Sequence, residues 1–199
     1  MPSDPKQKIV HAAMELFAAK GFNSTSVADL LSRTQLHSGS LYHFFPSKQD
    51  VLIAVLETYR DGIEPMLLQP AWSSIEDPIE RIFALLRAYR GMLLETDCTY
   101  GCPIGSLALE LHEPDPKVRE LLAENFTAWT RAIEGCLNAA GERLPRDTDK
   151  RALAEFILTT MEGGVMQART HRDIGYFDRA ITMLRNHFDL LQARAPAHA

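Results

Sequence analysis

The sequence has few of the features that mark secreted, fibrous or membrane-spanning chains. Its 199 residues hold three cysteines, an odd number that argues against a disulfide framework and for a reducing compartment. The longest aliphatic run, Val51 to Leu56, is far shorter than the ~20 residues of a membrane span. The polar start, MPSDPKQK, shows no secretory signal. We therefore expect a soluble cytoplasmic protein with no membrane partner.

The remaining composition is that of a globular protein. Hydrophobic residues make up 46% of the chain, which excludes a disordered chain, and 11 glycines and 11 prolines exclude a collagen-like one. The net charge of −5 is unevenly spread, because residues 1–50 carry five Lys and Arg against four Asp and Glu and the rest carries −6. A weakly basic N-terminal segment on an acidic body permits nucleic-acid binding without requiring it.

The hydrophobic periodicity predicts an all-α fold of about nine helices. Apolar residues recur at helical spacing, and no segment shows the sustained alternation of a half-buried strand. Helices are expected around Ile9–Phe17, with Pro5 in the first turn and Gly21 as the stop, and over 26–33, 38–45, 48–62, 79–96, 103–112, 117–140, 149–172 and 176–193. Ser26 and Asp29 have the spacing of a capping box. The segment Pro65–Pro78, which contains Trp72, is expected to be a loop.

The first three helices have the lengths and spacing of a helix-turn-helix unit, in which the third helix enters the DNA major groove. Ser38, Gly39 and Ser40 are small enough for a backbone to approach DNA closely at a helix N-terminus. Tyr42 and His43 can hydrogen-bond phosphates or base edges. Alternatively, Tyr42 and Phe45 could be ordinary core aromatics.

This segment contains the runs Thr25-Ser-Val-Ala-Asp-Leu30 and Gly39-Ser-Leu-Tyr-His-Phe-Phe-Pro-Ser-Lys48. Both runs are similar to the TetR/AcrR family of bacterial transcriptional regulators. The resemblance covers roughly residues 8–56 and implies a homodimer that binds double-stranded DNA. The candidate DNA-binding residues are Thr25, Ser26, His37, Ser38, Gly39, Ser40, Tyr42, His43 and Lys48.

The chain departs from the family pattern at two places. Thr34 and Gln35 replace the usual Ala-Gly of the turn, so Gln35 needs a positive φ angle. His37 and Ser38 replace a common Ser-Lys, which removes a phosphate contact that His37 could restore; a cap or a solvated position for His37 is an equal alternative. These changes affect the operator sequence rather than the fold.

Cys102 precedes Pro103 and is therefore expected at a helix N-terminus, where a thiolate is favoured. Its Gly-Cys-Pro-Ile-Gly-Ser-Leu-Ala context resembles a subset of TetR-like repressors, some of which sense electrophiles such as N-ethylmaleimide. Cys98 could then resolve an oxidised Cys102. The alternative is that Cys102 is a small buried apolar residue. Cys136 is expected in the core.

No metal site, cofactor or enzyme activity is expected. Cys98 and Cys102 lack a second ligand pair, and His112-Glu113 lacks the second histidine of a zinc hydrolase motif. A cysteine hydrolase using Cys102 and His112 is a minor alternative without a supporting signature.

The C-terminal helices are expected to bind a small apolar or electrophilic effector and to form the dimer. The candidate pocket residues are Phe83, Tyr89, Cys102, Phe126, Trp129, Met161 and Met166, which could equally be plain core. The candidate dimer residues are Gly163, Gly164, Phe177, Ile181, Leu184 and Phe188, which could instead cover the core of one chain.

The sequence thus predicts a homodimeric, effector-released repressor that reads a pseudo-palindromic operator. Residues 1–47 would bind DNA, and residues 48–199 would bind the effector and dimerise, with 48–62 as the linking helix. A constitutive DNA-binding dimer without an effector is the main alternative.

Overall fold

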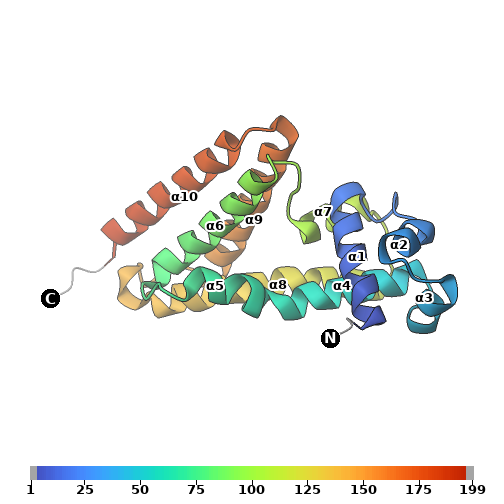
Figure 1. Ribbon diagram of the computed structural model, residues 1–199. Coiled ribbons are helices and arrows are strands. Elements are labelled where there is room, and N and C mark those ends of the chain that lie inside the picture. Colours follow the sequence, from blue (N-terminus) through green and yellow to red (C-terminus); the bar gives the residue numbers. More distant parts are fainter. Residues whose placement is uncertain (1–3, 196–199) are drawn as a thin grey trace. The chain divides into compact units, whose positions relative to one another are not determined.

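The computed structural model describes residues 4–195, and in this range every regular element is helical, which confirms the all-α fold (Figure 1). Within these described residues, nine α-helices have seven residues or more, and α5 is a single turn. The α-helices are α1 Pro5–Lys20, α2 Val27–Thr34, α3 Ser38–Phe44, α4 Lys48–Ile63, α5 Gln69–Trp72, α6 Pro78–Glu95, α7 Pro103–Glu110, α8 Pro116–Ala139, α9 Lys150–His171 and α10 Gly175–Ala193. Across residues 4–195, none of these helices has the length and apolar character needed to cross a membrane.

The helix boundaries follow local capping chemistry. Gly21 ends α1 with a φ of 86°, in the left-handed region that glycine favours. Ser26 caps α2 by accepting from the Asp29 N–H, and the Asp29 carboxylate accepts from the Ser26 N–H, so the predicted capping box is confirmed. Gln35 follows α2 with a φ of 57°, the conformation expected where the family has glycine.

The expected loop between residues 65 and 78 is wrong over its first half. A π-helical turn, Glu64–Leu68, continues from α4, and α5 follows it directly. Pro65 and Pro70 each occupy one of the first two positions of their helical segment, where the missing N–H disrupts no hydrogen bond within that segment. The two prolines are therefore compatible with helix in a segment that was expected to be a loop.

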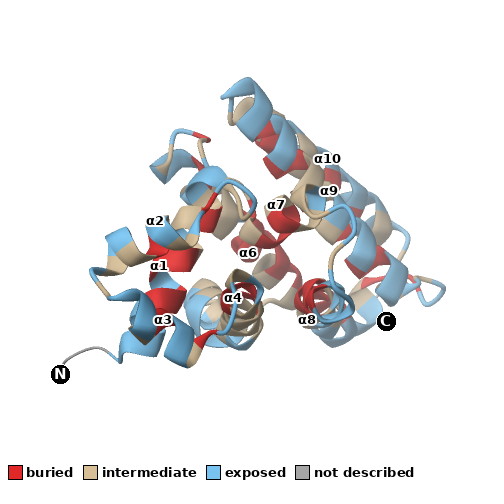
Figure 2. Cartoon of the chain, turned by 90° about the vertical axis from the view of Figure 1, so that its right-hand side faces the viewer, coloured by how far each residue is buried: buried red, intermediate tan, exposed pale blue. Residues whose placement is uncertain are grey.

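Contacts divide the chain into two compact units. The head unit contains the chain up to Asp61 together with Cys102–Phe126, and the body unit contains Gly62–Gly101 and the chain from Thr127 onward. Buried residues follow the inner faces of the helices within each unit (Figure 2). In the head unit, the side chains of Ile9, Phe17, Leu30, Leu41, Phe45 and Leu52 are buried.

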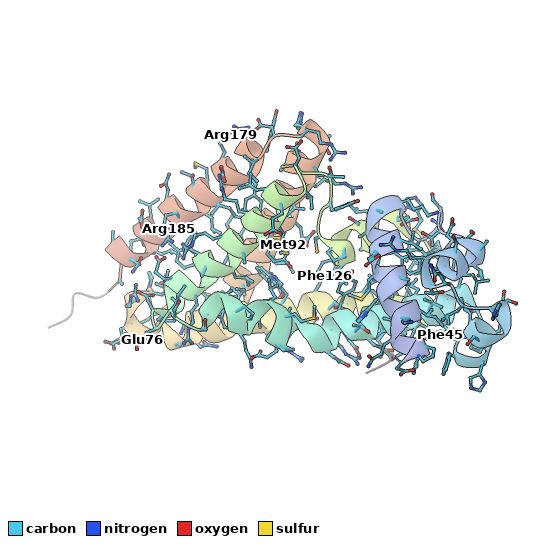
Figure 3. All side chains as sticks on the ribbon, viewed as in Figure 1. Phe45, Glu76, Met92, Phe126, Arg179 and Arg185 are labelled. Atoms are coloured by element: carbon cyan, nitrogen blue, oxygen red, sulfur yellow. The ribbon has the colours of Figure 1, made fainter. Side chains whose placement is uncertain are left out.

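The body unit packs α6, α9 and α10 against one another (Figure 1). A Cβ added to Gly164 of α9 would come within 3.1 Å of the Phe177 ring of α10, so this glycine permits the close approach of the two helices. On α10, Phe188 packs edge-on against Phe83 of α6, with ring centroids 5.3 Å apart. Arg185 of α10, labelled in Figure 3, covers the Phe83 ring and forms an ion pair with Glu80. This packing buries the apolar stripe of α10, which consists of Phe177, Leu184 and Phe188, inside the body unit.

Candidate nucleic-acid interface

The third helix has one anchored face and one open face. Leu41 is fully buried and Phe45, just past the end of α3, is 3% exposed, so both hold the helix against the head core. Tyr42 is 52% exposed, and His43 next to it is also exposed. Of the two aromatics that could be core residues, Phe45 is buried in the core, whereas Tyr42 is exposed to solvent.

The N-terminal end of α3 is open for close contact. Ser38 and Gly39 are exposed, Ser40 is half-buried, and a Cβ added to Gly39 would meet nothing within 4 Å. His37 occupies the N-cap position of α3, but its side chain makes no capping hydrogen bond and is exposed. The backbone of Ser38 and Gly39 and the His37 imidazole are thus accessible to an anion such as a phosphate, whereas the Ser40 N–H donates to the His37 carbonyl at 3.0 Å.

Two of the predicted DNA-binding side chains are used inside the head unit instead. Thr25 is fully buried, and its hydroxyl donates to the Gly21 carbonyl at 2.7 Å. The Lys48 ammonium donates to the carbonyls of Phe22 and Thr25, both at 2.9 Å, and lies 4.2 Å from the centroid of the Phe22 ring. Neither side chain is oriented to meet a phosphate in this arrangement. Ser26 remains exposed beside them at the start of α2.

Two of the five Lys and Arg side chains within residues 4–50 form ion pairs. Lys20 pairs with Asp29 at 2.7 Å, and Arg33 pairs with Glu15. The hydrogen bond from Lys20, aided by those from Ser26, holds the pKa of Asp29 well below its usual range. Within residues 4–50, Lys6 and Lys8 at the start of α1 are exposed and take part in no ion pair.

Glu110, at the end of α7, contacts the turn between α1 and α2, and this contact was not predicted from the sequence. Its carboxylate accepts hydrogen bonds from the Phe22 N–H at 2.9 Å and from the Asn23 N–H at 2.6 Å. The partners lie 88 and 87 residues apart in the sequence, and no local motif indicates such a pairing. Glu110 therefore ties a distant helix to the turn before α2.

At the opposite end of α7, Cys102 occupies the N-cap position, as the sequence predicts. Its Sγ accepts a hydrogen bond from the Gly105 N–H at 3.5 Å, and the residue is buried. Tyr59 of α4 lies nearby: burial, with a smaller contribution from Cys102, raises the pKa of Tyr59 to about 12. An eight-residue helix of about 12 Å separates Cys102 from the exposed His112, so the two do not form a catalytic pair.

The other two cysteines are also buried. Burial raises the pKa of the Cys98 thiol, and Cys98 belongs to the body unit whereas Cys102 belongs to the head unit. Burial raises the pKa of Cys136 to about 11. Both thiols are therefore less reactive than an exposed cysteine at neutral pH. Residues 4–195 contain no group of three or more His, Cys, Asp or Glu side chains that could hold a metal ion.

Two family models match the chain. One, described as bacterial regulatory proteins of the tetR family, matches residues 9–55 and so contains the helix-turn-helix segment. The other, described as the C-terminal domain of LmrA/YxaF-like transcriptional regulators, matches residues 78–183, more than half of the chain. The chain belongs to the TetR family.

Individual relatives agree with this assignment. The HTH-type transcriptional regulator YxaF of Bacillus subtilis is 28% identical over 170 residues, covering 85% of this chain and 87% of that protein. The HTH-type transcriptional repressor DhaR of Mycobacterium sp. is 23% identical over 181 residues, covering 90% and 89%. The crystal structure of a regulatory protein TetR from Rhodobacter sphaeroides has the same fold, with a TM-score of 0.83, 24% identity and coverage of 91% and 97%. This TetR-family chain is a DNA-binding transcriptional regulator.

The predicted effector residues of this TetR-family chain come from several helices. Phe83, Trp129 and Met161 are buried in the body unit, on α6, α8 and α9. The Trp129 Nε1 is buried and finds no hydrogen-bond acceptor among the described residues. Met166 lies on the exposed face of α9. Tyr89 is a half-buried member of the body unit, and Phe126 a half-buried member of the head unit.

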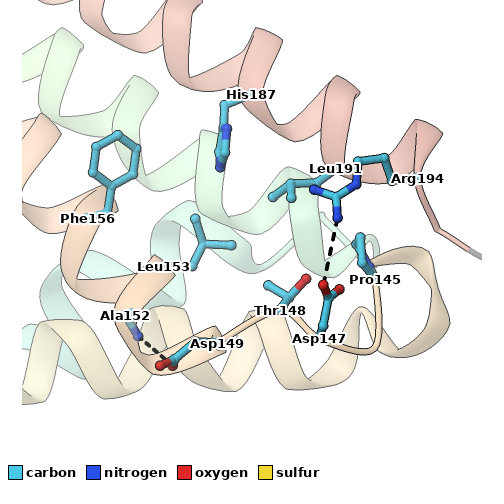
Figure 4. Close-up of a pocket in the computed structure, with 10 residues that line it drawn as sticks. All are labelled: Pro145, Asp147, Thr148, Asp149, Ala152, Leu153, Phe156, His187, Leu191 and Arg194. Carbon is cyan, nitrogen blue, oxygen red and sulfur yellow. Dashed lines mark hydrogen bonds and ion pairs between the residues drawn. The ribbon is translucent and has the colours of Figure 1, made fainter.

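The hollow shown in Figure 4 lies at a different place in the body unit. Its volume is about 450 Å³, and it is bordered by the start of α9 and the end of α10. Arg194 and Asp147 form an ion pair across it at 3.7 Å. Its lining residues, none of which was predicted for the effector pocket, are Pro145, Asp147, Thr148, Asp149, Ala152, Leu153, Phe156, His187, Leu191 and Arg194.

The residues predicted for the dimer interface of this TetR-family chain divide into two groups. Phe177, Leu184 and Phe188 are 1%, 2% and 0% exposed within a single chain, so they form core and offer no surface to a partner. Gly164 contacts α10 and serves the same internal packing. Gly163 faces open space, and Ile181 is half-buried.

A different set of apolar side chains faces outward on α9 and α10. Phe156 of α9 contacts His187 of α10, with ring centroids 6.0 Å apart. Met183 and Leu190 lie four residues before and three residues after His187, so the three share one face of α10. Phe156, Met183 and Leu190 are all more than half exposed. We call Phe156, Met183, His187 and Leu190 the outer patch.

Proposed function

We propose that the chain is a homodimeric repressor in which α3 of each protomer reads one half-site of a pseudo-palindromic operator. The observation that carries the proposal is the division of α3 into an anchored face, with Leu41, and an exposed face, with Ser38, Gly39, Tyr42 and His43. Two such helices in a dimer would enter successive major grooves about one helical turn apart. Residues 1–47 would bind DNA, and residues 48–199 would supply the dimer and effector functions through the linking helix 48–62.

The outer patch supports a dimer as the working form. Exposed apolar side chains that share one face of two neighbouring helices typically mark a protein interface. A second copy placed by two-fold symmetry would cover this face with its own α9 and α10, forming a four-helix arrangement. Gly163 lies seven residues after Phe156 on α9 and would allow the partner helix to approach closely.

The DNA proposal is tested by replacing Tyr42 with alanine. Operator affinity is expected to fall by at least about 1 kcal/mol, because the exposed hydroxyl and ring no longer contact the groove. Fluorescence anisotropy on DNA from the region upstream of the protein's own gene measures the effect. Tyr100→Ala, at an exposed tyrosine of the body unit, is the matched control and should bind like the wild type. Equal affinities of all three proteins would contradict the assignment of α3.

Release by a small apolar or electrophilic molecule is the second part of the proposal. The buried Trp129 N–H, which has no acceptor among residues 4–195, supports a ligand site in the body unit, since buried indole donors normally have partners. Cys102 supports a covalent route, because its sulfur lies at the start of α7. An effector that prefers a conformation with misplaced heads would lower operator affinity by roughly 5- to 150-fold.

N-ethylmaleimide distinguishes the covalent route from a non-covalent one. The reagent is expected to release the wild-type protein from DNA and to leave Cys102→Ser bound. Serine is itself a good N-cap, so this variant should keep the start of α7 intact. Cys98→Ser is the control and should respond like the wild type. If wild type and Cys102→Ser ignore the reagent equally, Cys102 is structural, and the effector is non-covalent or absent.

A further inference from the structure

The turn between α1 and α2, Gly21–Ser26, is held from two sides by opposite charges. The Glu110 carboxylate accepts from the N–H groups of Phe22 and Asn23, while the Lys48 ammonium donates to the carbonyls of Phe22 and Thr25. Glu110 comes from α7 and Lys48 from α4, so two separate helices of the head unit fix one short segment. Charge-assisted hydrogen bonds of this kind are stronger than neutral ones.

The Glu110 carboxylate lies directly beside the backbone of Gly21. A Cβ added to Gly21 would lie 2.8 Å from a Glu110 carboxylate oxygen, closer than such contacts normally come, and the Gly21 φ of 86° also favours glycine. Each carboxylate oxygen accepts one N–H, so the pair of bonds needs both oxygens. The contact is therefore specific for a carboxylate rather than for any polar side chain.

The turn held by Glu110 and Lys48 is followed directly by α2, which belongs to the helix-turn-helix unit proposed to bind DNA. The Thr25 hydroxyl donates back to the Gly21 carbonyl, and Ser26 caps α2 as the next residue. The position of the turn thus sets where α2 begins. In a helix-turn-helix unit, this second helix crosses the DNA backbone and supports the recognition helix.

We propose that Glu110 is a positioning residue for DNA binding: through α7 it fixes the α1–α2 turn, and with it the start of α2, in the geometry that recognises the operator. This inference rests on the proposed operator binding and extends it to a residue outside the helix-turn-helix segment. Because Glu110 touches the turn rather than the DNA, its loss should affect specific binding more than non-specific binding, which depends mainly on phosphate charge.

Glu110→Gln is the decisive variant. Its amide supplies one acceptor and one donor, so one of the two N–H groups faces a second donor. Operator affinity is expected to fall about 10-fold, whereas affinity for a scrambled duplex changes less than about 2-fold. Hydrogen exchange of the Phe22 and Asn23 amides, followed by NMR without DNA, should become faster. Glu113→Gln, at an exposed glutamate three residues on, should match the wild type in all three measurements.

A second variant covers the case in which Glu110→Gln folds poorly. Glu110→Asp keeps the charge but withdraws it by one methylene group, and should give an intermediate loss of operator affinity with the wild-type helical content. Unchanged operator affinity and unchanged amide exchange in Glu110→Gln, alongside weak binding by Tyr42→Ala, would overturn the role of Glu110 and leave the DNA proposal standing. Absence of specific binding by the wild type would overturn both.

Discussion

Phe188→Ala is expected to lower the free energy of unfolding by about 3–5 kcal/mol, the range for deleting a buried aromatic ring. Phe188 is completely buried within one chain and packs edge-on against Phe83, and the Arg185 guanidinium covers the Phe83 ring. Removal of the ring would leave a cavity between α10 and α6 that neither helix can close without losing its other contacts. Guanidinium unfolding followed by circular dichroism at a fixed protein concentration measures the change.

The neighbouring residue Asp189 provides the control. It is exposed on α10, and Asp189→Ala should change the free energy of unfolding by less than about 0.5 kcal/mol. This comparison also decides between core and interface for the stripe that contains Phe188. If Phe188→Ala unfolds like the wild type but sediments as a monomer, the stripe faces a partner chain and the internal packing described above is wrong.

The second large effect is the loss of the proposed dimer when negative charges are placed on the outer patch. The double variant Met183→Glu/Leu190→Glu should raise the dissociation constant of the dimer at least about 100-fold. Both protomers would carry the two new carboxylates, and the two-fold interface would bury all of them without a cation partner. Sedimentation velocity across a range of micromolar concentrations would show monomer where the wild type shows dimer. Helical content should stay unchanged, since both side chains are exposed in the single chain.

Met66→Glu is the matched control for this experiment. Met66 is also an exposed methionine of the body unit, but it lies in the π-helical turn rather than on α9 or α10. This variant should remain dimeric. A dimer that survives the double substitution would place the interface elsewhere on the chain, whereas a monomeric Met66→Glu would point to the π-helical turn.

Helix positions could be predicted from the sequence because their signals are local. The Ser26–Asp29 capping box and the left-handed Gln35 depend on residues within a few positions of one another, and both occur as expected. The π-helical turn and α5 fall within the segment expected to be a loop, although Pro65 and Pro70 both fit the first turn of a helix.

Partners in space could not be predicted in the same way. The apolar stripe of α10 shows which residues are buried, but not whether the covering surface comes from the same chain or another. For Phe188 that surface is α6 of the same chain. The partners of Lys48 and Glu110 were equally unpredictable from the sequence. Lys48 bonds a carbonyl 23 residues away and Glu110 accepts from an N–H 88 residues away, and no local pattern around either residue indicates these pairings.

The pairing of cations within the head has a consequence for how binding depends on salt. Lys20, Arg33 and Lys48 are occupied by Asp29, Glu15 and two carbonyl groups, which leaves Lys6 and Lys8 as the cations available to phosphates within residues 4–50. A dimer would then displace only about four counterions from DNA, and the logarithm of its association constant would fall with the logarithm of salt concentration with a slope of about −4. Such a dimer would gain little from random duplex, and its residence on the operator would depend on uncharged donors that meet the correct bases.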